Sequence, residues 1–216
     1  MTYTHAIWDF NGTILNDVDA GILAVNRLLA ERNLPLLSGK EDYYRVFRFP
    51  IREYYVALGF DFSVESYETV APLWVSLYLE YVKDAPLCQG VQEALSCFRE
   101  RGLTQTLLSA SEKGMLQEQM ASLGPLGYFD GLLGRDDIHA HSKLDIARSW
   151  RQAHPDARAF VVGDTEHDCE AAKAMGADCY LIAGGHQPKE KLIATGYPVF
   201  DSLFELIDFL IAEKKI

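Results

Sequence analysis

The sequence predicts an α/β protein with a doubly wound, Rossmann-like and mostly parallel sheet, into which a helical domain is inserted. Apolar strand-like runs alternate with amphipathic segments from about Gln89 onward, which is typical of parallel sheets covered by helices. A block with helical periodicity and no strand alternation precedes them. Polar residues stand at the ends of several predicted strands, where such sheets bind ligands. We therefore assign residues 1–16 and 85–216 to an α/β core domain and residues 17–84 to a helical cap domain.

The first predicted strand covers Thr4 to Asp9, a short run of β-formers and apolar residues that ends at the turn signal Asn11-Gly12. The block that follows repeats apolar residues at helical spacing, so it predicts several amphipathic helices. The residues that we assign to the apolar faces of these helices are Ile22, Val25, Leu28, Leu29, Tyr54, Val56, Leu58, Leu73, Leu77 and Tyr81.

The remaining part of the core alternates strands with helices. Strands are predicted where apolar or β-branched residues run together, at Thr104 to Leu108, Ala159 to Gly163 and Cys179 to Ile182, and a short apolar stretch lies at Gly131 to Leu133. Helices are predicted between them, at Lys113 to Leu123, Lys143 to Ala153 and Cys169 to Met175. A final helix follows Ser202, because Ser202 and Glu205 fit a capping box before an apolar stripe.

Composition excludes several classes of function. The formal net charge is −11, with 20 basic and 31 acidic side chains, which opposes binding to nucleic acid or to an anionic membrane. No apolar run reaches the roughly 18 residues needed to span a bilayer, and the first residues do not resemble a cleavable signal. The four cysteines show no CxxC spacing, so we expect reduced core thiols. These features predict a soluble cytoplasmic protein, either a monomer or a homodimer.

Four groups of polar residues stand where predicted strands end or a helix begins, and they are expected to share one site. Asp9 is followed by the Gly12-Thr13 turn, whose backbone N–H groups could bind an anion. Ser109 could donate a hydrogen bond to a phosphoryl oxygen, and Lys143 could neutralise one. Asp164 and Asp168 could hold a hard divalent cation together with Asp9.

Four segments in this order resemble the motifs of the haloacid dehalogenase-like hydrolase superfamily. The helical block between the first two resembles the cap of its phosphoglycolate phosphatase and β-phosphoglucomutase branch. The segments are DFNGT at residues 9–13, LLSAS at 107–111, SKLD at 142–145 and VGDTEHDCEAAKAMGA at 162–177.

The resemblance implies a phosphatase that acts on a small phosphorylated metabolite, with Mg²⁺ as cofactor. It implies that Asp9 attacks phosphorus to form an aspartyl-phosphate, while Ser109 and Lys143 hold the transferring group. Magnesium would be bound by Asp9, the backbone carbonyl of Asn11 and Asp164, with Asp168 as a further ligand or supporting acid. The further residues expected to bind substrate are Gly12, Thr13, Ala110, Arg45 and Arg48.

Asn11 departs from the family pattern, because phosphatases of this family usually have an aspartate there that protonates the leaving group and deprotonates water. Asparagine does neither, so a contribution of about 10²–10⁴-fold would be missing. Three interpretations remain open. The substrate could carry a good leaving group, as an acyl phosphate does; the protein could be a weak enzyme kept for binding or regulation; or Asn11 could be an introduced substitution.

Two other branches of the superfamily also lack that aspartate. The 2-haloacid dehalogenases use no metal, and the presence of both Asp164 and Asp168 counts against their chemistry. The phosphonoacetaldehyde hydrolases need a cap lysine that forms a Schiff base, for which Lys40 is a candidate by position alone. A solvated surface lysine is the simpler interpretation of Lys40.

Several other polar residues have simple structural interpretations. Arg45 and Arg48 could share a helix face over the site, or could belong to a solvated face. His139 and His141 form an HxH pair that lacks a third nearby metal ligand, so surface histidines are the simpler interpretation. Ser111 could cap the next helix or take the place of Ser109.

Overall fold

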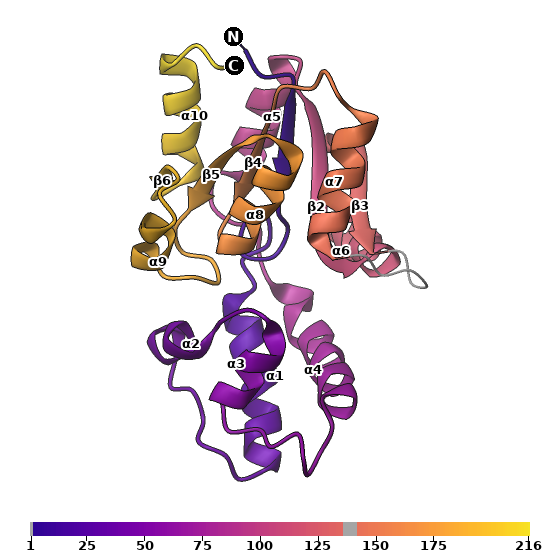
Figure 1. Cartoon of the computed structure of the whole chain (residues 1–216), viewed down its shortest axis with the longest axis vertical. Coiled ribbons are helices and arrows are strands. Elements are labelled where there is room, and N and C mark those ends of the chain that lie inside the picture. Colours follow the sequence, from indigo (N-terminus) through magenta and orange to yellow (C-terminus); the bar gives the residue numbers. More distant parts are fainter. Residues whose placement is uncertain (1, 136–141) are drawn as a thin grey trace. The chain divides into compact units, whose positions relative to one another are not determined.

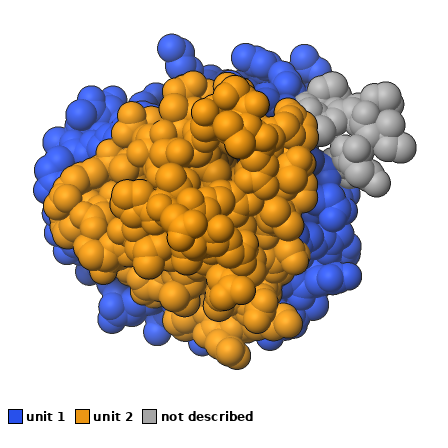
Figure 2. All heavy atoms as spheres, turned by 90° about the horizontal axis from the view of Figure 1, so that it is seen from below, with its two compact units in different colours: residues 1–15, 87–216 blue, residues 16–86 orange. Residues whose placement is uncertain are grey.

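The structure is a computed structural model that describes residues 2–135 and 142–216 (Figure 1). The HxH pair of His139 and His141 lies outside the described residues. The chain divides into two compact units, which Figure 2 colours separately: unit 1 is residues 1–15 and 87–216, and unit 2 is residues 16–86. Among the described residues, no helix combines the length and the apolar character needed to cross a membrane.

Unit 1 is built on a six-stranded sheet in which all neighbouring strands are parallel, in the order β3-β2-β1-β4-β5-β6. This arrangement confirms the predicted doubly wound fold class. The strands are β1 (His5–Trp8), β2 (Thr104–Glu112), β3 (Gly131–Arg135), β4 (Ala159–Gly163), β5 (Asp178–Ile182) and β6 (Val199–Phe200). The helices of unit 1 are α5 (Val91–Glu100), α6 (Lys113–Leu123), η2 (Pro125–Tyr128), α7 (Lys143–Ala153), α8 (Glu166–Met175), α9 (Lys189–Ala194) and α10 (Leu203–Ala212).

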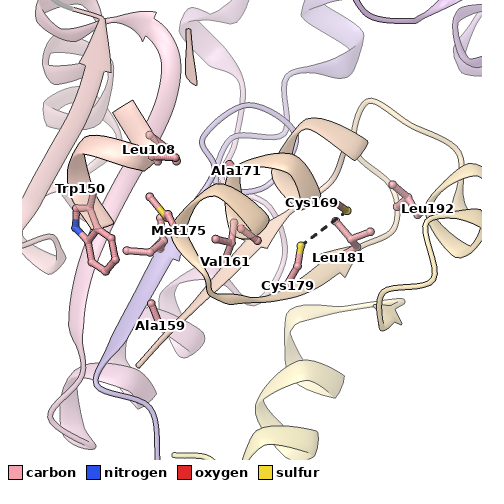
Figure 3. Close-up of a cluster of buried hydrophobic side chains, with 13 residues drawn as sticks. Leu108, Trp150, Ala159, Val161, Cys169, Ala171, Met175, Cys179, Leu181 and Leu192 are labelled. Atoms are coloured by element: carbon pink, nitrogen blue, oxygen red, sulfur yellow. Dashed lines mark hydrogen bonds between the residues drawn. The ribbon is translucent and has the colours of Figure 1, made fainter. Parts of the chain in front are cut away.

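Alternating side chains of the strands pack against helices on both faces of the sheet. On one face, Ile7 of β1 and Val161 of β4 belong to a cluster with Trp150 of α7 and Met175 of α8 (Figure 3). On the other face, Trp8 stacks near Phe98 of α5, with ring centroids 5.5 Å apart. Because successive residues of a strand point to opposite faces, strands covered on both sides must be apolar at nearly every position.

The cysteines of unit 1 contain no disulfide, in agreement with the prediction of free thiols. Cys169 and Cys179 are buried in the cluster of Figure 3, with their sulfur atoms 4.0 Å apart. Cys88 and Cys97 are only partly buried, so the prediction of core thiols is wrong for these two.

Unit 2 consists of helices, which are α1 (Val18–Glu31), α2 (Lys40–Val46), α3 (Ile51–Ala57), α4 (Tyr67–Tyr81) and the short 3-10 helix η1 (Val82–Asp84). Its core combines aliphatic residues of α1 with aromatic residues of α2 and α3, such as Tyr43 and Tyr54, whose ring centroids lie 5.8 Å apart. The buried Asp17 carboxylate before α1 accepts a hydrogen bond of 2.7 Å from the Tyr78 hydroxyl of α4.

Three residues that we assigned to buried helix faces are instead exposed. Val56, Leu73 and Tyr81 are between 36% and 46% exposed. In α4 the buried positions are Val70 and Tyr78. This helix is apolar on most of its surface, so several choices of stripe fit the sequence equally well.

Two further expectations differ in detail. β2 continues to Glu112 instead of ending at Leu108, and its register with β3 shifts between these two residues. Such an irregularity lets a strand continue after its regular pairing has ended. The Ser202 hydroxyl caps α10 by accepting from the Glu205 N–H, as expected, but the Glu205 carboxylate accepts from the Asp201 N–H. In a capping box this carboxylate would accept from the N–H of Ser202, the N-cap residue. Here it accepts from the N–H of Asp201, one residue before the N-cap.

Candidate active site

The candidate site lies where β1 and β4 end side by side. Asp9 follows β1 directly, and its N–H donates to the carbonyl of Val162 at 2.9 Å. Asp164 follows β4 directly. Because the chain continues from these two strands toward opposite edges of the sheet, this is the switch point at which doubly wound sheets bind ligands.

Three carboxylates meet at this point. One oxygen each of Asp9, Asp164 and Asp168 lies within 4.8 Å of the others. Asp9 is 9% exposed, and Asp164 and Asp168 are fully buried. Burial raises the pKa of Asp9 well above its usual value and the pKa of Asp164 to about 6, in each case with the neighbouring acids adding to the effect. Burial and mutual repulsion therefore both disfavour the charged forms of Asp9 and Asp164.

Lys143 supplies the positive charge that faces these acids. Its Nζ donates to Asp168 Oδ1 at 2.6 Å and also to Asp9 Oδ1. Burial alone would lower the pKa of Lys143, but the two carboxylates outweigh this and raise it. Lys143 is the first residue of α7, which begins with a capping box between Ser142 and Asp145, so the position of the ammonium is set by a well-defined helix start.

Asp168 is held by the first turn of α8. Its Oδ2 accepts from the N–H of Asp164 at 3.1 Å and from the N–H and hydroxyl of Thr165 at 2.9 and 2.8 Å. A Cβ on Gly163 would lie 2.2 Å from Asp168 Cγ, so glycine is required there. With Oδ2 fixed in this way, Oδ1 faces Lys143.

Asp164 is oriented by two loops. Its Oδ1 accepts from the Thr13 hydroxyl at 3.0 Å, and its Oδ2 accepts from the His186 N–H at 2.6 Å. A Cβ on Gly12 or on Gly185 would lie 2.2 Å from the same Oδ2. Both loops therefore come as close to the carboxylate as backbone can, and Gly12 also has a φ of +76°, which favours glycine.

The other residues predicted for this site lie around the same strand ends. Asn11 forms an isolated bridge with Leu15, so it belongs to the tight turn after β1. Ser109 and Ala110 follow Leu107, which pairs with Trp8 of β1. The buried Ser109 hydroxyl accepts from the N–H of Ser111 at 3.1 Å, while Ala110 is exposed.

Arg45 and Arg48 do not share a helix face, so the first of the two interpretations of these residues is wrong. α2 ends at Val46 and Phe47 is already extended, so Arg48 lies outside the helix. Arg45 forms an ion pair of 2.8 Å with Asp42, and the Arg48 guanidinium donates to the carbonyls of Arg45 and Val46. Lys40, the Schiff-base candidate, lies 3.5 Å from the carboxylate of Asp19.

Sequence reasoning missed the part of the site that the loop after β5 contributes. His186 and Gln187 follow the buried strand DCYLI and the pair Gly184-Gly185. Asp9 and Asp164 were identified because polar residues and glycines follow a predicted strand. His186 and Gln187 follow a predicted strand in the same way, so the sequence contained the signal for this part of the site. The capping role of Thr165 was also missed, although Thr165 and Asp168 have the spacing of a capping box.

The donor set fits a hard divalent cation. Carboxylate oxygens are the ligands that Mg²⁺ prefers, and three of them converge here beside the Lys143 ammonium. Burial and the neighbouring acids raise the pKa values of Asp9 and Asp164, and a divalent cation between them would favour their charged forms.

Known proteins share sequence or fold with this chain. The chain is 25% identical over 191 residues to a phosphoglycolate phosphatase of Mesorhizobium japonicum, which covers 83% of this chain and 82% of the relative. A haloacid dehalogenase-like family hydrolase of Streptococcus pneumoniae has the same fold, with a TM-score of 0.76 and 18% identity, over 96% of this chain and 98% of that one. The protein tyrosine kinase A of Mycobacterium tuberculosis also shares it, with a TM-score of 0.79 and 21% identity, over 97% and 98% of the two chains.

The family model described as haloacid dehalogenase-like hydrolase matches residues 6–182. This range includes the three carboxylates and Lys143, together with all of unit 2. The chain therefore belongs to the haloacid dehalogenase-like hydrolase family.

Proposed function

We propose that the protein is a magnesium-dependent phosphatase that hydrolyses a small phosphorylated metabolite through an aspartyl-phosphate on Asp9. The observation that carries this proposal is the contact of one ammonium, Lys143 Nζ, with Asp9 and Asp168 beside a third buried acid, Asp164. Membership of the hydrolase family and similarity to a phosphoglycolate phosphatase support the reaction class.

Asp9, Asp164 and the backbone carbonyl of Asn11 would hold the magnesium ion, with Asp168 as a further ligand or a supporting acid. A bound divalent cation neutralises negative charge and lets an anionic carboxylate approach an anionic phosphate. The contact of Asp168 Oδ1 with Lys143 supports the view that Asp168 also orients the lysine.

In the first step, an oxygen of Asp9 forms a bond to phosphorus while the bond from phosphorus to the leaving oxygen breaks. Lys143 and the Ser109 hydroxyl balance the charge of the transferring group, together with the backbone of Ala110, Gly12 and Thr13. Water then attacks the aspartyl-phosphate, which releases phosphate and restores the carboxylate. Because the Thr13 hydroxyl already donates to Asp164, its contribution to the phosphate would come from the backbone.

Asn11 bears on the choice of substrate. An amide neither donates a proton to a leaving group nor removes one from water, so the native protein should favour substrates whose leaving group needs no protonation. Acyl phosphates are such substrates. Arg45 and Arg48 remain candidates for binding the rest of the substrate, but as separate contacts instead of a shared helix face.

The Asn11→Asp variant tests the proposed function. We expect phosphate release from ordinary phosphate monoesters to rise by about 10²–10⁴-fold, with a smaller change for acyl phosphates. The measurement is phosphate release across a panel of both classes with Mg²⁺, for the native protein and the variant. Phosphate release from neither protein would contradict the proposal and redirect the search to carbon–halogen and carbon–phosphorus substrates. Binding of a phosphate analogue without turnover by the native protein would indicate a regulatory protein.

The effect of Mg²⁺ on stability should depend on pH. A carboxyl group with a raised pKa in the folded state binds its proton more tightly there than in the unfolded chain, so protonation favours folding. For Asp164 this contribution is lost as the pH rises through about 6, when the buried group ionises. We therefore expect Mg²⁺ to raise the Tm more at about pH 7.5 than at about pH 5, with NaCl of equal ionic strength as control. An equal rise at both pH values would contradict this.

A further inference from the structure

Gln187 is a fully buried polar residue in the loop between β5 and α9. Its side chain makes two hydrogen bonds to one residue, Glu166, the first residue of α8. Gln187 Oε1 accepts from the Glu166 N–H at 2.9 Å, and Gln187 Nε2 donates to Glu166 Oε1 at 3.2 Å. The first N–H groups of a helix have no partner within the helix, so Gln187 satisfies one that would otherwise be orphaned.

The Glu166 side chain, which accepts from Gln187, has a second partner. The Glu166 carboxylate accepts from Lys191 Nζ of α9 at 2.9 Å. Glu166 is thus bonded both to the loop, through Gln187, and to the helix that follows the loop. A buried amide with both its oxygen and its nitrogen engaged has a well-defined orientation, and the backbone that carries it is held accordingly.

The residue before Gln187 reaches the candidate cation site. The His186 N–H donates to Asp164 Oδ2 at 2.6 Å, and the Cβ position of Gly185 lies 2.2 Å from that oxygen. The loop therefore sets the direction of the Asp164 carboxylate through its backbone. Gln187 holds this loop on the start of α8, and Thr165 and Asp168 at that helix start flank the site. A shift of the loop would therefore change how Asp164 faces the other two acids.

We infer that Gln187 is a positioning residue for divalent cation binding, which acts on Asp164 through the His186 N–H. This inference rests on the proposed function, since it assigns a role toward the proposed cation. Within the part of the chain that the structure describes, both side-chain hydrogen bonds of Gln187 go to Glu166 and neither goes to the three carboxylates. Its effect is therefore expected on cation affinity, in the range found for residues that orient metal ligands.

The test compares Gln187→Met with a matched control, Gln105→Met. Gln105 is also a buried glutamine with two side-chain hydrogen bonds, from Trp8 Nε1 at 3.1 Å and to the Leu95 carbonyl at 2.9 Å. It pairs with Ala6 of β1, toward the end of the sheet away from the carboxylates. Each substitution keeps a long side chain and removes two hydrogen bonds, leaving the part-buried Glu166 N–H or the buried Trp8 Nε1–H without its partner, so both variants should lose stability and Gln105→Met at least as much.

Cation binding is measured directly with Mn²⁺ by electron paramagnetic resonance, and with Mg²⁺ by titration calorimetry, neither of which depends on turnover. We expect Gln187→Met to raise the Kd for the cation by about 10-fold or more, while Gln105→Met leaves it within about 2-fold of the native value. An unchanged Kd in Gln187→Met, or an equal rise in both variants, would overturn the inference and leave the proposed function intact. A native protein that bound neither cation would overturn the magnesium-dependent function and this inference together.

Discussion

Replacing Lys143 with methionine is expected to destabilise the metal-free protein by about 3–5 kcal/mol near pH 8, since it removes the partner of two buried carboxylates. The Lys143 side chain is 10% exposed, and those of Asp9 and Asp168 are 12% and 0% exposed. In such surroundings a charge without a partner cannot be solvated by water, so the cost is far larger than for a surface pair.

The loss should depend on pH in a defined direction. Without the ammonium, the pKa of Asp9 rises further, because the group that favours its charged form is gone. Protonation then relieves the repulsion, so the destabilisation should be smallest at about pH 5 and grow as the pH rises. Urea unfolding of the metal-free variant at several pH values measures this. Phosphate release should also fall, by about 10²–10³-fold.

Arg148→Met provides the control for Lys143→Met. Arg148 lies on the same helix, α7, and forms an ion pair of 2.9 Å with Asp145, but the two side chains are 59% and 42% exposed. An exposed pair of this kind contributes about 0–1 kcal/mol. If both variants lost similar stability, burial of the Lys143 cluster would not be the cause, and the electrostatic account of the site would be wrong.

The Asp9→Asn variant is expected to lose phosphate release by at least about 10³-fold, because an amide oxygen does not act as the attacking nucleophile. The fold should be retained. The substitution keeps the shape of the side chain and removes a charge whose burial raises the pKa of Asp9, and Lys143 keeps its contact with Asp168. Phosphate release and urea unfolding of the same preparation separate the two effects.

Asp130→Asn is a suitable control for Asp9→Asn. Asp130 accepts a hydrogen bond of 2.8 Å from the Gln105 N–H, so its carboxylate serves the start of β2 and not the strand ends of the site. We expect the rate of phosphate release by Asp130→Asn to remain near the native value. Substantial turnover by Asp9→Asn would show that another group attacks the substrate, and the aspartyl-phosphate proposal would fail.

Sequence patterns predicted the sheet best where burial is complete. The run Ala159–Gly163 is buried at every position and was identified to the residue, as were α6 and α7. Two elements that were not predicted, α9 and β6, have only six and two residues. Segments that short are formed by tertiary contacts more than by local preference, so their own residues carry little periodic signal.

A similar limit applies to the candidate site. Asp9, Lys143, Asp164 and Asp168 were singled out because charged side chains at strand ends and helix starts are visible in the sequence. The contact of the His186 backbone N–H with Asp164 is invisible there, since every residue except proline has such a group. The glycines that make room for this contact, and the Thr165–Asp168 spacing of a capping box, are the traces that the sequence does carry.

The strand order has a consequence for how the protein folds. β1 is the earliest strand along the chain, yet its partners β2 and β4 begin about 100 and 150 residues later, so His5 pairs with Thr104 and with Ala159. During synthesis this apolar segment emerges before either of the strands with which it pairs. Pairings between such distant segments form slowly. Asp9 meets Asp164 only when β4 docks beside β1. Assembly of the three-carboxylate cluster therefore requires completion of the sheet's centre, which depends on these distant pairings.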